Sequence, residues 1–342
     1  MFKQSFKQKI ILVTGGAGFI GSHLCDNLVK ENRVICIDNL STGKEKNIDF
    51  LLRHPNFEFI KHDINTPIDL EKAPELKKFK FRWQGLQEIY HLACPASPSM
   101  FDKLGVDVLL ASSFGTKTTL DLALKYKAKF LFLSSSVVYG KAMPGEELKE
   151  NYVGQLDPLG YHNCYIEGKR FGESLVHNYR NKYNLDAKII RVFTTYGPRM
   201  KLTDGRTISG FVARAMAGED VIVEGDQNIR NSYCYIDDLV NGIIKMMKSK
   251  ELGPINLGNP EDLPIIEVAK KVISSTNSKS QIVFKQREKG AHVSHIPNIE
   301  YAKDHLGWEP VVLLKSGLNK TINYLKVSKS SLEFNSFAQK KE

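Results

Sequence analysis

The sequence has few of the features that mark membrane, secreted or nucleic-acid-binding proteins. It contains no run of about 18 apolar residues, the length that a membrane-spanning helix needs. Residues 1–9 lack the apolar core and cleavage site of a signal peptide, so we expect a soluble, cytoplasmic protein with no membrane partner. The five cysteines are scattered and contain no C-x-x-C pair, which predicts reduced thiols and no metal site.

Concentrated positive charge is also lacking, although the formal net charge is +10. Lysines are spread along the whole chain without a long basic block, which predicts a solvated basic surface and no nucleic-acid partner. The composition, with 42% hydrophobic and 25% charged residues, is that of an ordinary globular protein. A chain of 342 residues is long enough for one large α/β domain and a smaller lobe.

Apolar runs typical of strands alternate with segments of helical period, such as residues 20–31 and 165–183. The strand-like runs lie at residues 10–14, 34–38, 57–61, 89–93, 130–134 and 188–193. This alternation predicts an α/β fold, a Rossmann doubly wound parallel sheet with a smaller C-terminal substrate-binding lobe. The expected parts are a Rossmann domain at 1–195 with further elements from about 230–260, a lobe at 196–327 and a polar tail at 328–342.

The segment ILVTGGAGFIGSHL at residues 11–24 places Gly15, Gly18 and Gly21 after a strand and before a helix. Such a turn lets the backbone approach a pyrophosphate and points a helix N-terminus at its charge. The next strand ends in Asp38, an acid that can bind both ribose hydroxyls and would repel a 2′-phosphate. This context predicts a dinucleotide site for NAD, rather than a glycine-rich turn without a ligand.

The third predicted strand is followed by Asp63. Its carboxylate could reach the adenine, or it could be an ordinary helix-capping aspartate. Both interpretations suit its position equally well. We expect the cofactor site to include further residues beside these motifs: Phe19, Ile20, Asn39, Ile64, Leu92 and Ala93.

A second motif, CYIEGKR at residues 164–170, places Tyr165 and Lys169 four residues apart on a predicted helix. Side chains at this spacing point the same way, and an ammonium beside a phenol stabilises the phenolate. Tyrosine then becomes a usable base near neutrality. Such a pair alone is common in helices, but here it follows a dinucleotide motif and a cluster of serines at the end of a strand, namely Ser134, Ser135 and Ser136.

Together these motifs resemble the extended short-chain dehydrogenase/reductases that act on nucleotide sugars. Within that superfamily the chain is most similar to the UDP-glucuronate decarboxylases, also called UDP-xylose synthases, from about Lys9 to Leu325. The more specific stretches are YHLACPASP at 90–98, CYIEGKR at 164–170, RVFTTYGPRM at 191–200, DGRTISGFVARA at 204–215, DDLVNGI at 237–243 and LGWEP at 306–310.

The resemblance implies a role for each residue of the second motif. Ser135 would hold the sugar hydroxyl, Tyr165 would take its proton, and Lys169 would bind the nicotinamide ribose and tune the tyrosine. A hydride would pass from sugar C4 to NAD. The resemblance also implies a nucleotide-sugar substrate, with a UDP-sugar favoured, and a homodimer formed through the helices at 115–126 and 165–183.

The chain departs from the decarboxylase pattern at several positions. The family's catalytic glutamate is Val137, preceded by Ser136, and the family's carboxylate-steering arginine is His295. The asparagine expected in the F-N-T-[FY]-G-P-R stretch is Thr194, and an arginine expected near the D-L-V element is displaced to Arg230. We predict that the substrate-binding residues are Pro95, Ser136, Val137, Thr194, Arg206, Arg230, Arg287 and His295.

These departures bear on the net reaction. Dehydration requires acids with shifted pKa values, and decarboxylation requires a cation beside the sugar carboxylate. His295 would supply that cation only if it were protonated. Epimerisation at C4 and release of a 4-keto sugar need only Ser135, Tyr165, Lys169 and NAD. We therefore expect a 4-epimerase or a C4-oxidising enzyme. The alternatives are a UDP-glucuronate decarboxylase with unusual residues and a non-catalytic binding protein, which the intact Ser135, Tyr165 and Lys169 disfavour.

The position of Asp38 at the end of the second predicted strand predicts that the protein binds NAD more tightly than NADP. A 2′-phosphate brought against this carboxylate in a partly desolvated loop should lose more than about 1.4 kcal/mol, or tenfold in affinity. Calorimetric titration with both dinucleotides measures the ratio. Equal dissociation constants for the two dinucleotides would show that Asp38 does not select NAD over NADP.

Overall fold

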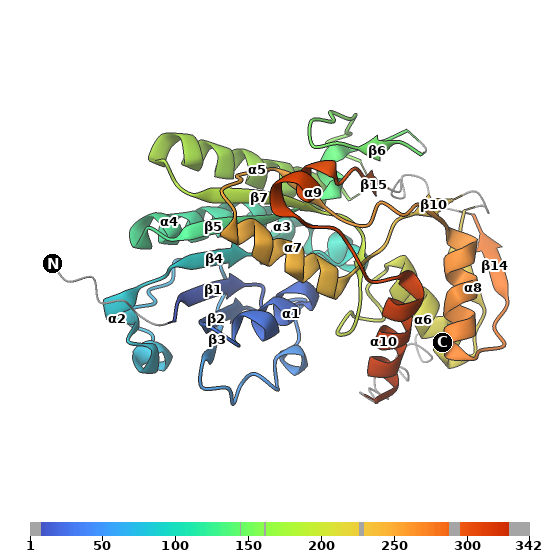
Figure 1. Ribbon diagram of the computed structural model, residues 1–342, viewed down its shortest axis with the longest axis horizontal. Coiled ribbons are helices and arrows are strands. Elements are labelled where there is room, and N and C mark those ends of the chain that lie inside the picture. The colour runs from blue at the N-terminus through green and yellow to red at the C-terminus, as the bar shows by residue number, and fades with distance from the viewer. Residues whose placement is uncertain (1–7, 144, 161, 226–228, 287–294, 328–342) are drawn as a thin grey trace.

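The computed structural model describes residues 8–143, 145–160, 162–225, 229–286 and 295–327. Its centre is a seven-stranded parallel sheet with the order β12-β7-β5-β4-β1-β2-β3 (Figure 1). Its strands are β1 Ile10–Thr14, β2 Arg33–Asp38, β3 Phe57–Lys61, β4 Glu88–His91, β5 Lys129–Ser135, β7 Ala187–Val192 and β12 Ile255–Leu257. The strand order runs outward from β1 in both directions, which confirms the predicted doubly wound Rossmann fold.

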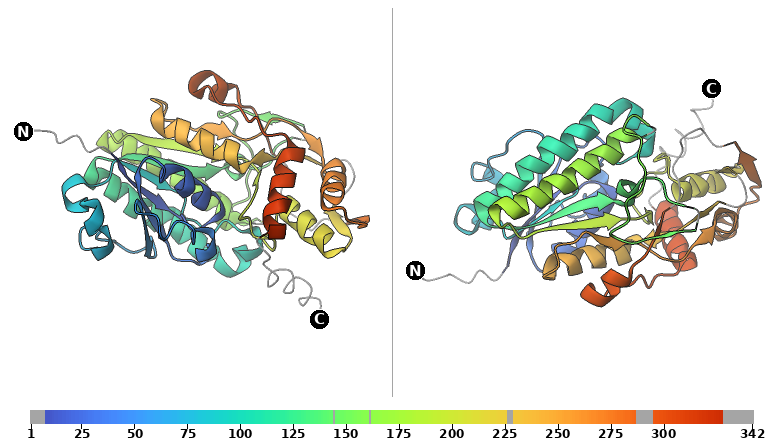
Figure 2. Two further views of the ribbon diagram at one scale, coloured as in Figure 1. Left: turned by 60° about the horizontal axis from the view of Figure 1, so that its bottom comes forward. Right: turned by 90° about the horizontal axis from the view of Figure 1, so that it is seen from above.

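Helices cover both faces of this sheet (Figure 2). One face packs against α1 Phe19–Leu28 and α7 Ile236–Lys248, which also contact each other. The other face packs against α3 Phe101–Leu110, the π-helical turn η4 Ala111–Gly115, α4 Thr116–Tyr126 and α5 Asn163–Tyr183. Short helical elements in the connections are η1 Glu45–Asn47, η2 Pro74–Phe79, α2 Phe81–Gln84, η3 Pro98–Met100 and η5 Ser136–Tyr139.

The central strands form from continuous apolar runs because both faces of the sheet are covered. All five residues of β1 are buried. Some predicted ends were wrong by a few residues. The helix expected at 20–31 ends at Leu28, where the Asn32 side chain donates to the Leu28 carbonyl oxygen at 3.0 Å. The strand expected at 89–93 ends at His91, because the chain turns away after the Leu92 amide donates to the Thr14 carbonyl oxygen.

A smaller group of elements lies beside the sheet, toward the end where the strands finish (Figure 1). It consists of α6 Thr207–Ala217, β9 Val221–Glu224, β10 Arg230–Asn231, β13 Leu263–Pro264, α8 Ile265–Thr276, β14 Ile282–Lys285 and α10 Leu314–Val327. Helix α8 packs between α6 and α10, and β9 pairs with β14. We call this group the small lobe. Two-stranded pairs of β8 Thr195–Tyr196 with β11 Cys234–Tyr235, and of β6 Glu147–Leu148 with β15 Ile296–Pro297, join the loops around it.

The chain returns to the sheet after entering the small lobe. Strand β12 pairs with β7, and α7 packs against the sheet. Helix α9 Glu300–Leu306 packs on α7 and β12. Trp308, buried just after α9, donates its indole N–H to the Asp238 carbonyl oxygen of α7 at 2.9 Å and fixes this position.

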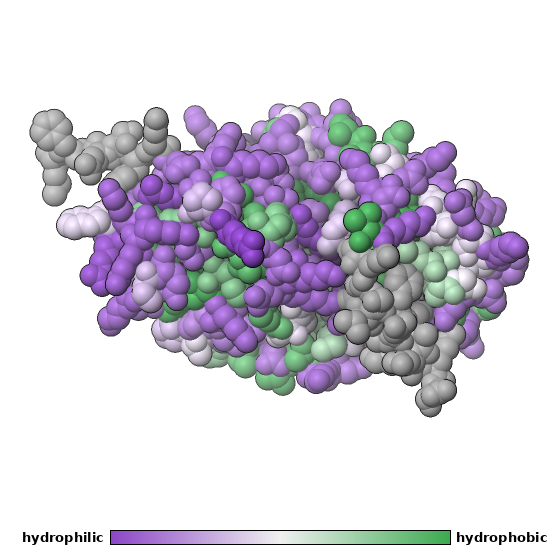
Figure 3. Space-filling model, turned by 90° about the horizontal axis from the view of Figure 1, so that it is seen from below, coloured by the Kyte–Doolittle hydropathy of each residue, from purple (hydrophilic) through white to green (hydrophobic). Residues whose placement is uncertain are grey.

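The surface is largely hydrophilic on the face drawn in Figure 3. Figure 3 shows one face on which hydrophilic side chains are spread across the molecule, with apolar side chains in separate patches between them. Within the described part of the chain, no helix is both long enough and apolar enough to span a bilayer.

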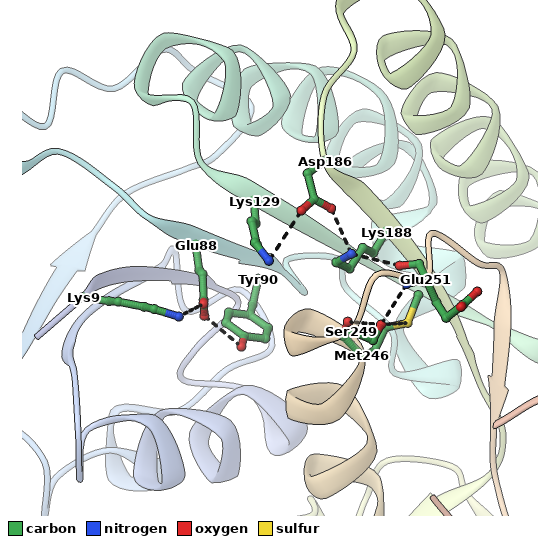
Figure 4. A network of polar contacts seen from close by, with 9 residues as sticks. All are labelled: Lys9, Glu88, Tyr90, Lys129, Asp186, Lys188, Met246, Ser249 and Glu251. Atoms are coloured by element: carbon green, nitrogen blue, oxygen red, sulfur yellow. Dashed lines mark hydrogen bonds and ion pairs between the residues drawn. The ribbon is translucent and has the colours of Figure 1, made fainter. Parts of the chain in front are cut away.

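Polar side chains close the amino ends of β4, β5 and β7 (Figure 4). Glu88 pairs with Lys9 at 2.6 Å and accepts the Tyr90 hydroxyl at 3.2 Å. The Lys188 ammonium is fully buried, and it contacts Asp186 and the Glu251 carbonyl oxygen, both at 2.9 Å. A buried ammonium needs such partners. These contacts therefore fill the end of the sheet that lies opposite the strand carboxyl ends.

A second polar contact joins α5 to the sheet. Arg191 of β7 donates two hydrogen bonds to Glu173 of α5, at 2.9 and 2.7 Å. The same carboxylate accepts the Ser134 hydroxyl of β5 at 2.6 Å. Both ionic side chains are only 13% exposed, so neither charge can rely on water. The contact fixes the position of α5 against β5 and β7.

Replacing Glu173→Ala should therefore destabilise the fold strongly. It leaves the Arg191 guanidinium buried without its carboxylate, a loss usually worth about 3–5 kcal/mol. Urea unfolding followed by circular dichroism measures the change. The matched control is Glu267→Ala, which removes an exposed ion pair with Lys270 on α8 and should leave the midpoint unchanged. Similar losses in the two variants would contradict the role given to Glu173.

Candidate active site

A cavity of about 1600 Å³ lies at the carboxyl ends of the strands and is lined by residues of both the Rossmann part and the small lobe. Ligands of open α/β sheets bind in this position. All candidate residues that the structure describes line this one cavity. They are Gly15, Gly18, Phe19, Ile20, Asp38, Asn39, Asp63, Ile64, Leu92, Ala93, Pro95, Ser135, Ser136, Val137, Tyr165, Lys169, Thr194, Arg206, Arg230 and His295. Arg287 lies outside the described residues.

The glycine turn after β1 leaves room for a ligand. Gly15 has φ +72°, and a Cβ on it would lie 2.8 Å from the Ala93 amide nitrogen. A Cβ on Gly21 would lie 2.1 Å from the Gly15 carbonyl oxygen, so α1 can start this close to β1 only with glycine. Helix α1 has no side-chain cap and no acid in its first turn, and its N-terminus stays available to a phosphate. The turn fits the pyrophosphate of a dinucleotide.

Asp38 and Asp63 order the two loops that follow β2 and β3. Asp38 accepts the amide hydrogens of Ala17 at 3.0 Å and Leu40 at 2.8 Å, and burial raises the pKa of its carboxyl. Asp63 accepts the amide hydrogen of Asn65 at 2.9 Å and an Asn39 side-chain hydrogen at 3.2 Å. The helix-cap interpretation of Asp63 is therefore wrong, since it caps a turn. Its contact with adenine stays a prediction.

Tyr165 and Lys169 lie on the cavity side of α5, and Ser135 ends β5 beside them. The Lys169 ammonium is buried, donates to the Leu133 carbonyl oxygen at 2.8 Å and lies 5.7 Å from the centre of the Tyr165 ring. Tyr165 stacks on Phe101 with ring centres 5.2 Å apart. The Ser135 hydroxyl oxygen accepts the Val137 amide hydrogen at 3.4 Å, which leaves its own hydrogen available.

The positions that depart from the decarboxylase pattern lie together in this cavity. His295 approaches the Ser136 hydroxyl at 3.3 Å through Nδ1 and the Gly140 carbonyl oxygen at 2.7 Å through Nε2. Burial lowers the pKa of His295 from its ordinary value, which favours the neutral ring at pH 7. The hypothesis that His295 offers a positive charge is therefore not supported. Val137 adds an apolar side chain to the same wall.

Two arginines reach the cavity from the small-lobe side. Arg206 donates to the Ala96 carbonyl oxygen at 2.6 Å and pairs with Asp204, which in turn accepts the Ser97 hydroxyl. Arg230 is half exposed and pairs with Asp262. Sequence reasoning missed Ser97 and Asp204, although both lie in quoted motifs, HLACPASP and DGRTISGF. They join the loop after β4 to the loop before α6, across the cavity.

Comparison with known proteins places the chain among nucleotide-sugar enzymes. It is 38% identical over 310 residues to UDP-glucuronic acid decarboxylase 3 of Arabidopsis thaliana, covering 90% of this chain and 86% of that protein. The UDP-glucose 4-epimerase of Thermotoga maritima, solved with UDP-glucose, superposes with TM-score 0.81 at 28% identity, covering 93% of this chain and 99% of that chain.

A second solved relative is the UDP-glucuronic acid 4-epimerase of Bacillus cereus in complex with UDP-glucuronic acid and NAD. It has TM-score 0.80 and 28% identity, covering 93% of this chain and 99% of that chain. These relatives are enzymes, and so is this protein. NAD, the cofactor predicted from the glycine turn and Asp38, is the cofactor of the family. With residues 11–258 matched by the family's sequence profile, the chain belongs to the NAD dependent epimerase/dehydratase family.

Proposed function

We propose that the enzyme oxidises C4 of a nucleotide-linked sugar and that the net reaction is 4-epimerisation or release of the 4-keto sugar. One observation carries this proposal. Ser135, Tyr165 and Lys169 line the same cavity as the glycine turn. Val137 lines it too, at the position where the decarboxylase pattern has its catalytic glutamate. The site thus holds a base for an alcohol and lacks the acid of the decarboxylase pattern.

In this proposal Tyr165 takes the proton of the C4 hydroxyl, and the Lys169 ammonium stabilises the resulting negative charge. The Leu133 carbonyl oxygen and the ring of Phe132, 5.0 Å from Nζ, hold that ammonium in place. Ser135 donates its free hydroxyl hydrogen to the substrate oxygen. NAD, when bound, accepts the hydride from C4.

Epimerisation requires the keto sugar to turn over and take the hydride on its other face. In this proposal the cavity of about 1600 Å³ holds NAD and the nucleotide sugar together, and the sugar turns over within it. A UDP-sugar is our preferred substrate, because the relatives described above act on or bind UDP-sugars.

Decarboxylation of UDP-glucuronate is the second candidate, favoured by the 38% identity to the plant decarboxylase. A 4-keto uronic acid can lose CO2 without an acid catalyst. The carboxylate would still need a partner, and neither the apolar Val137 nor the neutral His295 supplies a charge. We therefore rank this reaction below epimerisation. A purely binding role is disfavoured, since the relatives described above are enzymes.

We further propose that the protein forms a homodimer through α3, η4 and α5. Large apolar side chains are exposed on these elements, including Val106, Phe114 and Phe171, which are 71%, 59% and 52% exposed. Burying them against a second copy removes apolar surface from water. The family resemblance implied the helices at 115–126 and 165–183, which are α4 and α5, so this proposal shares α5 with that expectation and adds α3 and η4.

Tyr165→Phe tests the base. The substitution removes the hydroxyl while keeping the ring that stacks on Phe101, so NAD should still bind. Hydride transfer should fall about 100-fold or more, measured as NADH absorbance in single turnover with the sugar that is turned over. Tyr301→Phe, which removes a phenol hydroxyl from an exposed side chain on α9 outside the cavity, is the control and should react normally. Normal turnover by Tyr165→Phe would exclude this residue as the base.

Val137 tests the net reaction. The unmodified protein, given UDP-glucuronate and NAD, should form little or no UDP-xylose by proton NMR. Val137→Glu should gain some, because a placed carboxyl group supports proton transfer by factors of about 100 to 10,000. The substrate's own carboxylate reduces this gain by repulsion. Rapid conversion to UDP-xylose by the unmodified protein would reverse our ranking and establish the decarboxylase.

A further inference from the structure

The cavity wall beside Ser135 has a defined pattern of hydrogen-bond donors and acceptors. It is set by His295, which precedes β15 and is 5% exposed. Its ring lies between the Gly140 carbonyl oxygen, 2.7 Å from Nε2, and the Ser136 hydroxyl, 3.3 Å from Nδ1. Residues 159 positions apart in the chain thus form one polar unit within the wall.

The Gly140 contact fixes the hydrogen on the imidazole ring. A carbonyl oxygen can only accept, so Nε2 carries the hydrogen and donates it. Nδ1 of a neutral ring then holds a lone pair, and the Ser136 hydroxyl donates its hydrogen to it. The Ser136 oxygen is left with lone pairs alone to offer to a ligand. This residue therefore acts as an acceptor toward the cavity.

The three residues from Ser135 to Val137 consequently differ in what they offer. Ser135 has a free hydrogen to donate, Ser136 accepts, and Val137 is apolar. If Ser135 holds the oxygen on C4, the residues directly after it face the ring positions next to C4. Of the groups there, the C6 group on C5 extends furthest from the ring. It is a hydroxymethyl group in a hexose and a carboxylate in a uronic acid.

We propose that Ser136 and His295 make this wall a subsite for an uncharged, hydrogen-donating C6 group, so that the enzyme selects a UDP-linked neutral hexose over the corresponding uronate. The orientation of the sugar in this proposal rests on the proposed C4 oxidation. A hydroxymethyl group donates to the Ser136 oxygen and places its carbon against Val137. A carboxylate has no hydrogen to donate, and Ser136, Val137 and His295 give it neither a donor nor a positive charge.

The charged neighbours do not remove this preference. The Lys169 ammonium already donates to the Leu133 carbonyl oxygen, and the Arg206 guanidinium is paired with Asp204. Lys141, which follows Gly140, also lines the cavity, but its side chain is exposed to solvent, where water and salt screen its charge. A site built to accept a hydrogen bond from a hydroxyl discriminates strongly, because the wrong ligand leaves buried polar groups unpaired.

UDP-glucose and UDP-glucuronate differ only at C6 and provide the matched test pair. Their dissociation constants are measured by calorimetry on the Tyr165→Phe variant with NAD present, which separates binding from turnover. We expect UDP-glucose to bind at least about tenfold more tightly. UDP alone serves as the reference for the nucleotide part. Equal affinities, a preference for UDP-glucuronate, or failure of both sugars to bind would overturn the proposal.

Two substitutions at His295 separate its charge from its place in the wall. His295→Gln keeps one donor for the Gly140 carbonyl oxygen and one acceptor for Ser136, so the affinity ratio should stay within about threefold. His295→Arg adds a cation and should shift the ratio at least about tenfold toward UDP-glucuronate. Because both ligands are titrated into the same protein, a partly unfolded fraction does not alter the ratio. An unchanged ratio in His295→Arg would refute the assignment.

The outcome is distinguishable from failure of the proposed reaction. If the unmodified protein forms neither epimer nor 4-keto sugar while the affinity ratio behaves as expected, the C4 chemistry is wrong and the selectivity of the wall stands. If it oxidises UDP-glucose and UDP-glucuronate at C4 and binds both equally, the chemistry stands and the role of Ser136 and His295 is wrong.

Discussion

The active-site geometry depends on one buried ion pair, between Arg191 and Glu173. Glu173 lies one turn beyond Lys169 on α5, and its carboxylate also binds Ser134, the residue before Ser135. This contact, together with the hydrogen bond from Lys169 to the Leu133 carbonyl oxygen, positions α5 and its residues Tyr165 and Lys169 relative to Ser135. A charged pair with short hydrogen bonds is directional, which apolar packing alone is not. A reaction that requires Tyr165, Lys169 and Ser135 at fixed relative positions therefore depends on the ion pair between Arg191 and Glu173.

The two ends of the sheet show a clear division of polar groups. At the amino ends, Lys188 and Glu88 are matched with charged partners. At the carboxyl ends, the glycine turn, the free hydrogen of Ser135 and the acceptor side of Ser136 face a cavity. A buried polar group is stable only when it is paired. The hydrogen-bonding groups that face the cavity at the carboxyl ends therefore indicate where ligands could bind.

Local patterns in the sequence predicted most of the fold, and the candidate site residues that they named line one cavity where the structure describes them. Apolar runs, the glycine spacing and the four-residue interval from Tyr165 to Lys169 each depend on neighbours along the chain, so they can be recognised without coordinates. The contacts of His295 with Ser136 and of Asp204 with Ser97 span 159 and 107 residues. They arise only when loops from different parts of the chain meet. For the same reason, the neutral state of His295 and the return of α9 to the sheet could not be predicted.

The path of the chain through the small lobe has a consequence for recombination with relatives. The lobe is assembled from three stretches, one carrying α6, β9 and β10, one carrying β13, α8 and β14, and one carrying α10. Between them the chain goes back to build α7, β12 and α9 on the sheet. The lobe therefore cannot be exchanged as one continuous segment of the chain. A chimera that borrows another enzyme's sugar-binding half must cut the gene at several joints, and each donor piece must match the α8 surface on which the others pack.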